Sequence, residues 1–345
     1  MMKQFTSFKG LLALIVFLHH IELVDGAGDL AVCLFFTISG FLSAIGYHKR
    51  IFEPDWSYAS YLSGKIIRFY PMHWLLTFSL IPLILCTSDS LSAQFALLPV
   101  NLSLLQSLIP ISRVYFSWNA VSWYLSDTII FVALLPLILR WLSRATTKGK
   151  IIVWTTAFSL YALLWCILPS GYTHAIFYIH PFVRLLDYAV GVQCGLLYMT
   201  LLRKEHLLKH VERNRNLYQL GGWALFTSLF CLSFVPSELS LHSVIYLFPA
   251  CALLIIMAIN GGGILQNTYL QWFGSISFAF YLTHQVTLRY VHFLLGKVDC
   301  DIIYISAPLA FILTTAASYY LTYHIDKNIG LWLKRNSALR STTVR

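Results

Sequence analysis

The chain has 345 residues, of which 58% are hydrophobic, 16% are aromatic and only 11% are charged. A soluble domain carries about 25% charged residues, so this composition excludes an ordinary soluble protein and indicates a polytopic membrane protein. The formal net charge of +10 does not indicate a nucleic-acid partner. Lys and Arg occur in short clusters between apolar runs, which is the pattern that orients membrane helices.

The apolar runs predict an all-α fold, a bundle of about ten transmembrane helices with short loops. A polar stretch with Trp56, Tyr58 and Tyr61 precedes the third run and is typical of an interfacial segment. We expect one membrane domain over residues 1–325 and a basic cytoplasmic tail over residues 326–345. The predicted spans are residues 8–24, 30–47, 67–86, 118–140, 150–168, 176–200, 217–235, 242–260, 272–294 and 303–323.

The basic residues also predict how the bundle is oriented. With the N-terminus in the cytoplasm, the inside segments hold 20 of the 24 Lys and Arg residues. This partition favours both termini in the cytoplasm. It places Lys9 at the cytoplasmic mouth of the first span and His20 toward the outer half. The inside segments are 1–9, 48–68, 140–150, 203–215 and 324–345.

The first predicted span carries Lys9, His19, His20 and Glu22. A titratable group at membrane depth costs roughly 2.5 kcal/mol or more, so these residues are functional-site candidates. Lys9 and His20 share one helix face and lie about 16 Å apart along the axis, whereas His19 can pair with Glu22 three residues later. A neutral His is the usual general base near pH 7. The alternative is a pair of histidines at the lipid–water interface.

Two further polar groups begin the third and fourth spans. Lys65 and Arg68, in KIIRFYP, are three residues apart and can hold a phosphorylated ligand or contact lipid phosphate. Asp127, in SWYLSD, needs a His or Arg partner from another helix. Its alternative is an N-terminal cap made with Ser122 or Ser126.

Later spans carry the remaining candidates. Arg184 and Asp187 are three residues apart and are expected to form a pair within one helix. His284 lies in the middle of the ninth span, where it can pack, bond to a neighbouring helix or act directly. The chain has no HExxH spacing, Walker loop or GxSxG elbow, so we expect no metal and no buried Ser nucleophile.

In their order along the chain, these segments resemble the acyltransferase-3 family, which consists of membrane O-acyltransferases of the O-antigen acetylase type. The resemblance runs from about residue 5 to 325. It implies a ten-helix enzyme of the bacterial cytoplasmic (inner) membrane that moves acetyl from cytoplasmic acetyl-CoA to a sugar hydroxyl, often at the outer face. The segments that carry it are KGLLALIVFLHH, LFFTISGFL, KIIRFYP, SWYLSD, RLLDYAVGV and FGSISFAFYLTH.

The resemblance also implies roles for single residues. The family's basic residue followed by ten residues and a His falls on Lys9 and His20, with Lys where the family usually has Arg. Lys keeps the charge but loses bidentate phosphate binding. The family's Trp-Ser-Leu…Glu block falls on Trp123 to Asp127, with the shorter Asp in place of Glu. Its cytoplasmic basic motif falls on Lys65, Arg68 and Pro71.

We therefore predict a membrane O-acyltransferase in which His20 deprotonates the acceptor hydroxyl during direct transfer, a covalent acyl-histidine being the less favoured route. The expected partners are acyl-CoA as donor, a carbohydrate or glycolipid acceptor and membrane lipid. A transporter or flippase without acyl transfer, or a non-catalytic scaffold, is the alternative. The predicted catalytic residues are His20, Asp127 and His19; the predicted CoA contacts are Lys9, Lys65 and Arg68; the further candidates are Glu22, Ser39, Trp123, Ser126, Arg184, Asp187 and His284.

Overall fold

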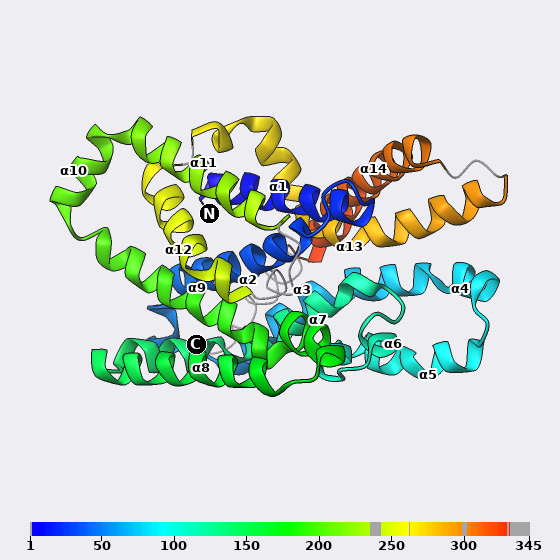
Figure 1. Ribbon diagram of the computed structural model, residues 1–345, viewed down its shortest axis with the longest axis horizontal. Coiled ribbons are helices and arrows are strands. Elements are labelled where there is room, and N and C mark those ends of the chain that lie inside the picture. Colours follow the sequence, from blue (N-terminus) through cyan, green and yellow to red (C-terminus); the bar gives the residue numbers. More distant parts are fainter. Residues whose placement is uncertain (1, 235–242, 262, 299–301, 330, 332–345) are drawn as a thin grey trace, which may run out of the picture.

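The computed structural model describes residues 2–234, 243–261, 263–298, 302–329 and 331, and no strand is present within these residues. The fold is an all-helical bundle (Figure 1). Most of the predicted tail lies outside the described residues. The helices are α1 (Lys3–His20), α2 (Ala27–Tyr47), α3 (Tyr58–Ser79), α4 (Ile81–Thr87), α5 (Leu91–Leu102), α6 (Ser112–Tyr115), α7 (Trp123–Arg144), α8 (Thr147–Ile167), α9 (Pro181–Leu201), α10 (Glu205–Arg213), α11 (Arg215–Leu232), α12 (Ser243–Asn260), α13 (Thr268–Gly296) and α14 (Ile303–Tyr320), with π-helices at His174–Ile179 and Leu321–Asp326.

Each of the ten predicted spans falls on a helix of 18 or more residues in the described part of the chain. Within the residues that the structure describes, six segments are long and apolar enough, by length and composition, to cross a membrane. They contain α2, α3 with α4, α7, α8, α9 and α14. α8 lies at the margin of the bundle (Figure 1), and none of its side chains is buried by the protein. The protein is therefore an all-helical membrane protein.

Several predicted helix boundaries are displaced by four residues or more, and two of them have a clear local cause. α1 ends at His20 rather than at residue 24, because the backbone turns into the left-handed region at Glu22 (φ 61°) and Gly26 (φ 82°). α3 begins at Tyr58 rather than at residue 67, since the Ser57 hydroxyl accepts from the Ser60 backbone N–H and caps the helix. Tyr58 and Tyr61 of the polar stretch before the third run thus belong to the first part of α3, whereas Trp56 precedes the helix.

The central helices approach one another at glycines. α1 packs along α13, and α2 packs along α9. A Cβ on Gly274 would lie 2.0 Å from the Thr6 carbonyl oxygen, and one on Gly191 would lie 2.2 Å from the Thr37 carbonyl oxygen. Small residues at such crossings let membrane helices come into backbone contact. These contacts fix four of the helices that carry the polar side chains described below.

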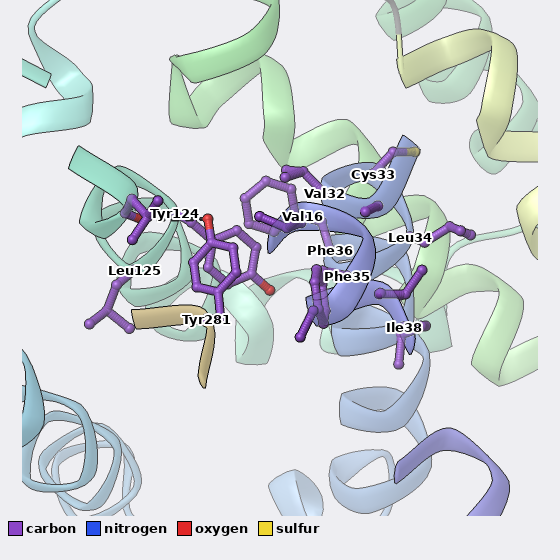
Figure 2. Close-up of a cluster of buried hydrophobic side chains, with 14 of the residues drawn as sticks. Val16, Val32, Cys33, Leu34, Phe35, Phe36, Ile38, Tyr124, Leu125 and Tyr281 are labelled. Carbon is purple, nitrogen blue, oxygen red and sulfur yellow. Dashed lines mark hydrogen bonds between the residues drawn. The ribbon is translucent and has the colours of Figure 1, made fainter. Parts of the chain in front are cut away.

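An aromatic core joins α2, α7 and α13. Figure 2 shows Tyr124 and Tyr281 beside Phe35 and Phe36. The ring centroids of Phe36 and Tyr124 are 4.5 Å apart, and those of Tyr124 and Tyr281 are 5.1 Å apart. Tyr281 lies about one helical turn before His284 on α13. The aromatic core therefore holds the segment of α13 that carries this histidine.

Candidate active site

Two histidines from different helices meet where α1 ends. The ring centroids of His20 and His284 are 5.1 Å apart, and the two ring planes are inclined by only 26°. His20 is exposed, whereas His284 is fully buried. Phe17, on α1, presents its ring to His284 at a centroid distance of 6.5 Å. The site thus pairs one accessible imidazole with one that the protein encloses.

A backbone carbonyl fixes the His284 ring. His284 Nδ1 lies 2.6 Å from the Tyr281 carbonyl oxygen, and a carbonyl only accepts hydrogen bonds, so Nδ1 must carry the hydrogen. The lone pair of the neutral ring is then on Nε2. Nε2 is buried and has no hydrogen-bond partner among the described residues. His284 therefore presents a defined acceptor nitrogen.

His19 faces the turn after α1. The predicted pair of His19 with Glu22 is wrong, because Glu22 lies beyond the end of the helix, where it is exposed. Asp25 takes that place, with its Oδ1 3.8 Å from His19 Nδ1. A Cβ on Gly28 would lie 2.6 Å from His19 Cδ2, so a glycine is needed there to admit the ring.

Arg184 and Asp187 form a buried ion pair on α9. Arg184 Nη2 lies 3.1 Å from Asp187 Oδ2, as the three-residue spacing predicts, and both side chains are almost completely buried. The guanidinium also lies over the rings of Phe36 (5.1 Å) and Tyr178 (5.6 Å). A guanidinium between aromatic faces and a carboxylate is stabilised on both sides. The positive charge is thus compensated inside the protein.

Asp127 is fully buried in the first turns of α7. Besides burial, the Ser107 side chain and then the charges of Arg184 and Asp187, on α9, act on it. Asp127 forms no ion pair within the described residues, so the expected His or Arg partner from another helix stays a prediction. The alternative of an N-terminal cap does not apply, because Ser122 precedes α7 without a side-chain cap bond. Ser126 instead donates to the Leu104 carbonyl oxygen (2.6 Å) and so anchors the preceding loop.

Two further candidates, Ser39 and Trp123, lie against tyrosine side chains. Ser39, on α2, lies beside the Tyr124 hydroxyl. Trp123 is buried and packs on Tyr178 with a centroid distance of 5.1 Å. Both residues therefore line the buried polar region between α2, α7 and α9, and neither contacts the histidine pair directly in this arrangement.

Sequence reasoning missed two polar connections. Asp29, in the first turn of α2, bonds to Tyr178 and lies within the field of Arg184. Arg289, on α13, donates from Nη1 to the Trp118 carbonyl oxygen (2.7 Å), and Trp118 has a φ of 57°. An acid at the start of an apolar run and a lone Arg at the end of one were the available signals. Neither indicates which helix supplies the partner.

The three cations that are predicted to contact CoA do not form a single cluster. Lys9, on α1, lies within electrostatic reach of Arg68, on α3. Arg68 Nε lies 3.5 Å from Asp326 Oδ1, and both side chains are partly exposed. Lys65 Nζ instead lies over the Tyr47 ring at 5.1 Å. Lys65 and Arg68 are therefore close in sequence but contact different partners.

Comparisons with known proteins point to one class of reaction. A family model described as an acyltransferase domain, that of the acyltransferase-3 family, matches residues 3–325. The chain is also 26% identical, over 293 residues, to "Acyltransferase MdmB" of Streptomyces mycarofaciens, which covers 78% of this chain and 70% of that protein. No solved structure matches the chain.

Proposed function

We propose, because this chain belongs to the acyltransferase-3 family, that it moves an acyl group from cytoplasmic acyl-CoA to a hydroxyl of a surface carbohydrate or glycolipid. The chain is a membrane acyltransferase; acetyl-CoA as the donor is part of the proposal. One observation carries it: α1 bears an accessible histidine at its end and, about 16 Å away along the axis, a lysine that faces Arg68.

The cations support a site for the CoA phosphates. Lys9 lies within electrostatic reach of Arg68, so the two like charges repel each other, and Asp326 contacts Arg68 from a partly exposed position. A bound phosphate relieves this repulsion and accepts charge-assisted hydrogen bonds from both side chains. Lys65, one turn before Arg68 on α3, adds to the positive potential.

His20 supports the chemistry at the other end of α1. Its exposed ring can reach an acceptor hydroxyl. In the proposed step, His20 removes the hydroxyl proton while the oxygen attacks the thioester carbonyl. The C–S bond then breaks, and the CoA thiolate takes the proton from His20. His19 is the alternative base. Asp127 contributes indirectly, through its electrostatic interaction with Arg184 and Asp187.

The proposed topology follows from the same separation of roles. Ten transmembrane helices with both termini in the cytoplasm would put the cations near the donor and His20 near the outer face. The long helices of the described chain and the partition of basic residues support this arrangement. We place the enzyme in the bacterial inner membrane, with the acceptor at its outer side.

The direct test is acceptor-dependent release of CoA. Purified protein in lipid nanodiscs is mixed with labelled acetyl-CoA and a panel of sugars and glycolipids. Both the free thiol and the acylated acceptor are measured. We expect release that requires an acceptor, and a loss of about 10²- to 10⁴-fold in His20→Ala, which is the usual contribution of a general base.

His206→Ala is the matched control, because His206 is an exposed histidine on α10. It should keep full activity. A transporter or flippase would not release CoA in response to an acceptor. Full activity of His20→Ala would contradict the role of His20, and no acceptor-dependent release by the wild type across the panel would contradict the acyl transfer from acetyl-CoA.

A further inference from the structure

We propose that His284 is a positioning residue for His20: its Nε2 accepts a hydrogen bond from the His20 ring and so sets which His20 nitrogen faces the acceptor. The inference rests on the proposed function, since it concerns the base of that reaction. It starts from two features of the histidine pair, a fixed tautomer and a buried acceptor atom without a partner.

The first feature is the fixed tautomer of His284. Because Nδ1 donates to the Tyr281 carbonyl oxygen at 2.6 Å, the neutral ring has its lone pair on Nε2. The aromatic core around Tyr281 holds this carbonyl in place (Figure 2). Nε2 is therefore a permanent acceptor while His284 is neutral, and it is not a proton donor.

The second feature is that this acceptor is left unsatisfied. Nε2 is buried and lacks a hydrogen-bond partner among the described residues. A buried acceptor that is left unsatisfied destabilises the protein, so such an atom in a native protein requires an explanation. The neighbouring ring of Phe17 cannot donate. His20, stacked at 5.1 Å, is the neighbouring ring with an N–H to offer.

His20 is free to make this bond. Its ring contacts the rings of His19 and His284, and no hydrogen bond holds it within the described residues. It is also the last residue of α1 and is exposed. The near-parallel stack itself does not align an N–H with Nε2. A rotation of the His20 side chain brings one ring N–H toward Nε2 and turns the other nitrogen outward.

The resulting series of hydrogen bonds explains how the neutral His284 assists His20 as a base. The Tyr281 carbonyl holds His284 Nδ1–H, His284 Nε2 holds one N–H of His20, and the remaining His20 nitrogen faces the acceptor hydroxyl with its lone pair. When His20 takes the proton, His284 stabilises the imidazolium by accepting the same hydrogen bond. No second proton moves, and the reaction balances as in the direct transfer. A third group that orients a catalytic base is a general feature of such sites.

The test compares two substitutions that differ in hydrogen-bonding ability. His284→Gln places an amide oxygen, an acceptor, near the position of Nε2, whereas His284→Leu removes the acceptor. For each variant, kcat and the KM for acyl-CoA are measured under saturating acceptor. We expect His284→Leu to lower kcat about 10- to 100-fold, the usual effect of losing such an orienting partner. The KM for acyl-CoA should not change, and His284→Gln should recover most of kcat.

His73→Leu is the matched control for folding. His73, on α3, is also fully buried and bonds to a backbone carbonyl, that of Asn101, at 2.9 Å. It should lower the thermal unfolding midpoint as His284→Leu does while keeping kcat. This control separates a loss of packing from a loss of positioning.

Each result decides the inference. Wild-type kcat in His284→Leu would overturn it. So would a folded His284→Gln with the same low kcat as His284→Leu. If His20→Ala is inactive while His284→Leu is fully active, the inference fails and the proposed function stands. If the wild type shows no acyl transfer at all, both fail.

Discussion

The two polar regions along α1 use charge in opposite ways. Near Lys9, which is partly buried, two cations lie within electrostatic reach of each other, and Arg68 is paired with the partly exposed Asp326. Near His20, the neighbouring groups are the imidazoles of His19 and His284, and the charge of Arg184 is compensated in the interior. A region with uncompensated charge suits an anionic ligand, whereas a region of titratable rings suits proton transfer.

The buried ion pair provides the largest expected effect. Arg184→Met removes the cation of a pair whose side chains are 1% and 0% exposed. It should destabilise the protein by about 3–5 kcal/mol, since breaking a buried pair leaves an uncompensated charge. Unfolding in nanodiscs, followed by circular dichroism, measures this change.

Arg68→Met is the control for that experiment, because its pair with Asp326 is 59% and 25% exposed. Exposed pairs contribute about 0–1 kcal/mol. Equal destabilisation by the two substitutions would contradict the distinction between Arg184, whose charge is compensated by Asp187, and Arg68, whose charge is available to a ligand.

The next largest effect is expected at the contact between α1 and α13, because α1 carries Lys9 and His20 and α13 carries His284. Gly274→Ala puts a Cβ 2.0 Å from the Thr6 carbonyl oxygen, and overpacking of this kind costs about 1–3 kcal/mol. We expect a lower unfolding midpoint and a loss of acyl transfer, since α13 also carries His284. Gly64→Ala, on α3, meets nothing within 4 Å and should leave both quantities unchanged. A normal midpoint in Gly274→Ala would show that the two helices separate easily at this point.

The sequence is informative about features that depend on local spacing. Hydrophobic runs indicate helices wherever the structure has long ones, and the i to i+3 rule predicts the Arg184–Asp187 pair. Local rules fail at Glu22, because the left-handed turn ends α1 before the expected partner of His19. Lys65 lies over Tyr61, four residues earlier on α3, and over the Tyr47 ring from another helix, and local spacing accounts only for the first of these contacts.

The pairing of His20 with His284 could not be predicted from either segment alone. Each histidine is visible as a polar residue in an apolar run, but their contact depends on the close approach of α1 and α13. That approach depends on Gly10 and Gly274. A Cβ added to either glycine would meet the backbone of the opposite helix. Glycines inside apolar runs are signals for such crossings, but a single sequence does not state which two helices meet.

A moderate effect is expected at the donor end. Lys9→Ala should raise the KM for acyl-CoA about 10-fold, because one charge-assisted hydrogen bond contributes about 1.5 kcal/mol, and it should leave kcat unchanged. Steady-state kinetics over a range of salt concentrations measures both, since an electrostatic contact weakens with ionic strength. Lys148→Ala removes an exposed cation in the first turn of α8 and serves as the control. A fall in kcat with constant KM would instead assign Lys9 to the chemical step.

The smallest effect tests the departure from the family pattern. Lys9→Arg restores the residue that the acyltransferase-3 pattern usually has at this position, and its planar guanidinium can bind a phosphate through two parallel hydrogen bonds. We expect the KM for acyl-CoA to fall about 3-fold, with kcat unchanged, because the proton-transfer region at His20 is not altered. The longer side chain must also remain beside Arg68, and the added repulsion limits the gain. A rise in the KM would mean that this repulsion outweighs the second hydrogen bond, in which case Lys is the better cation for this particular arrangement of α1 and α3.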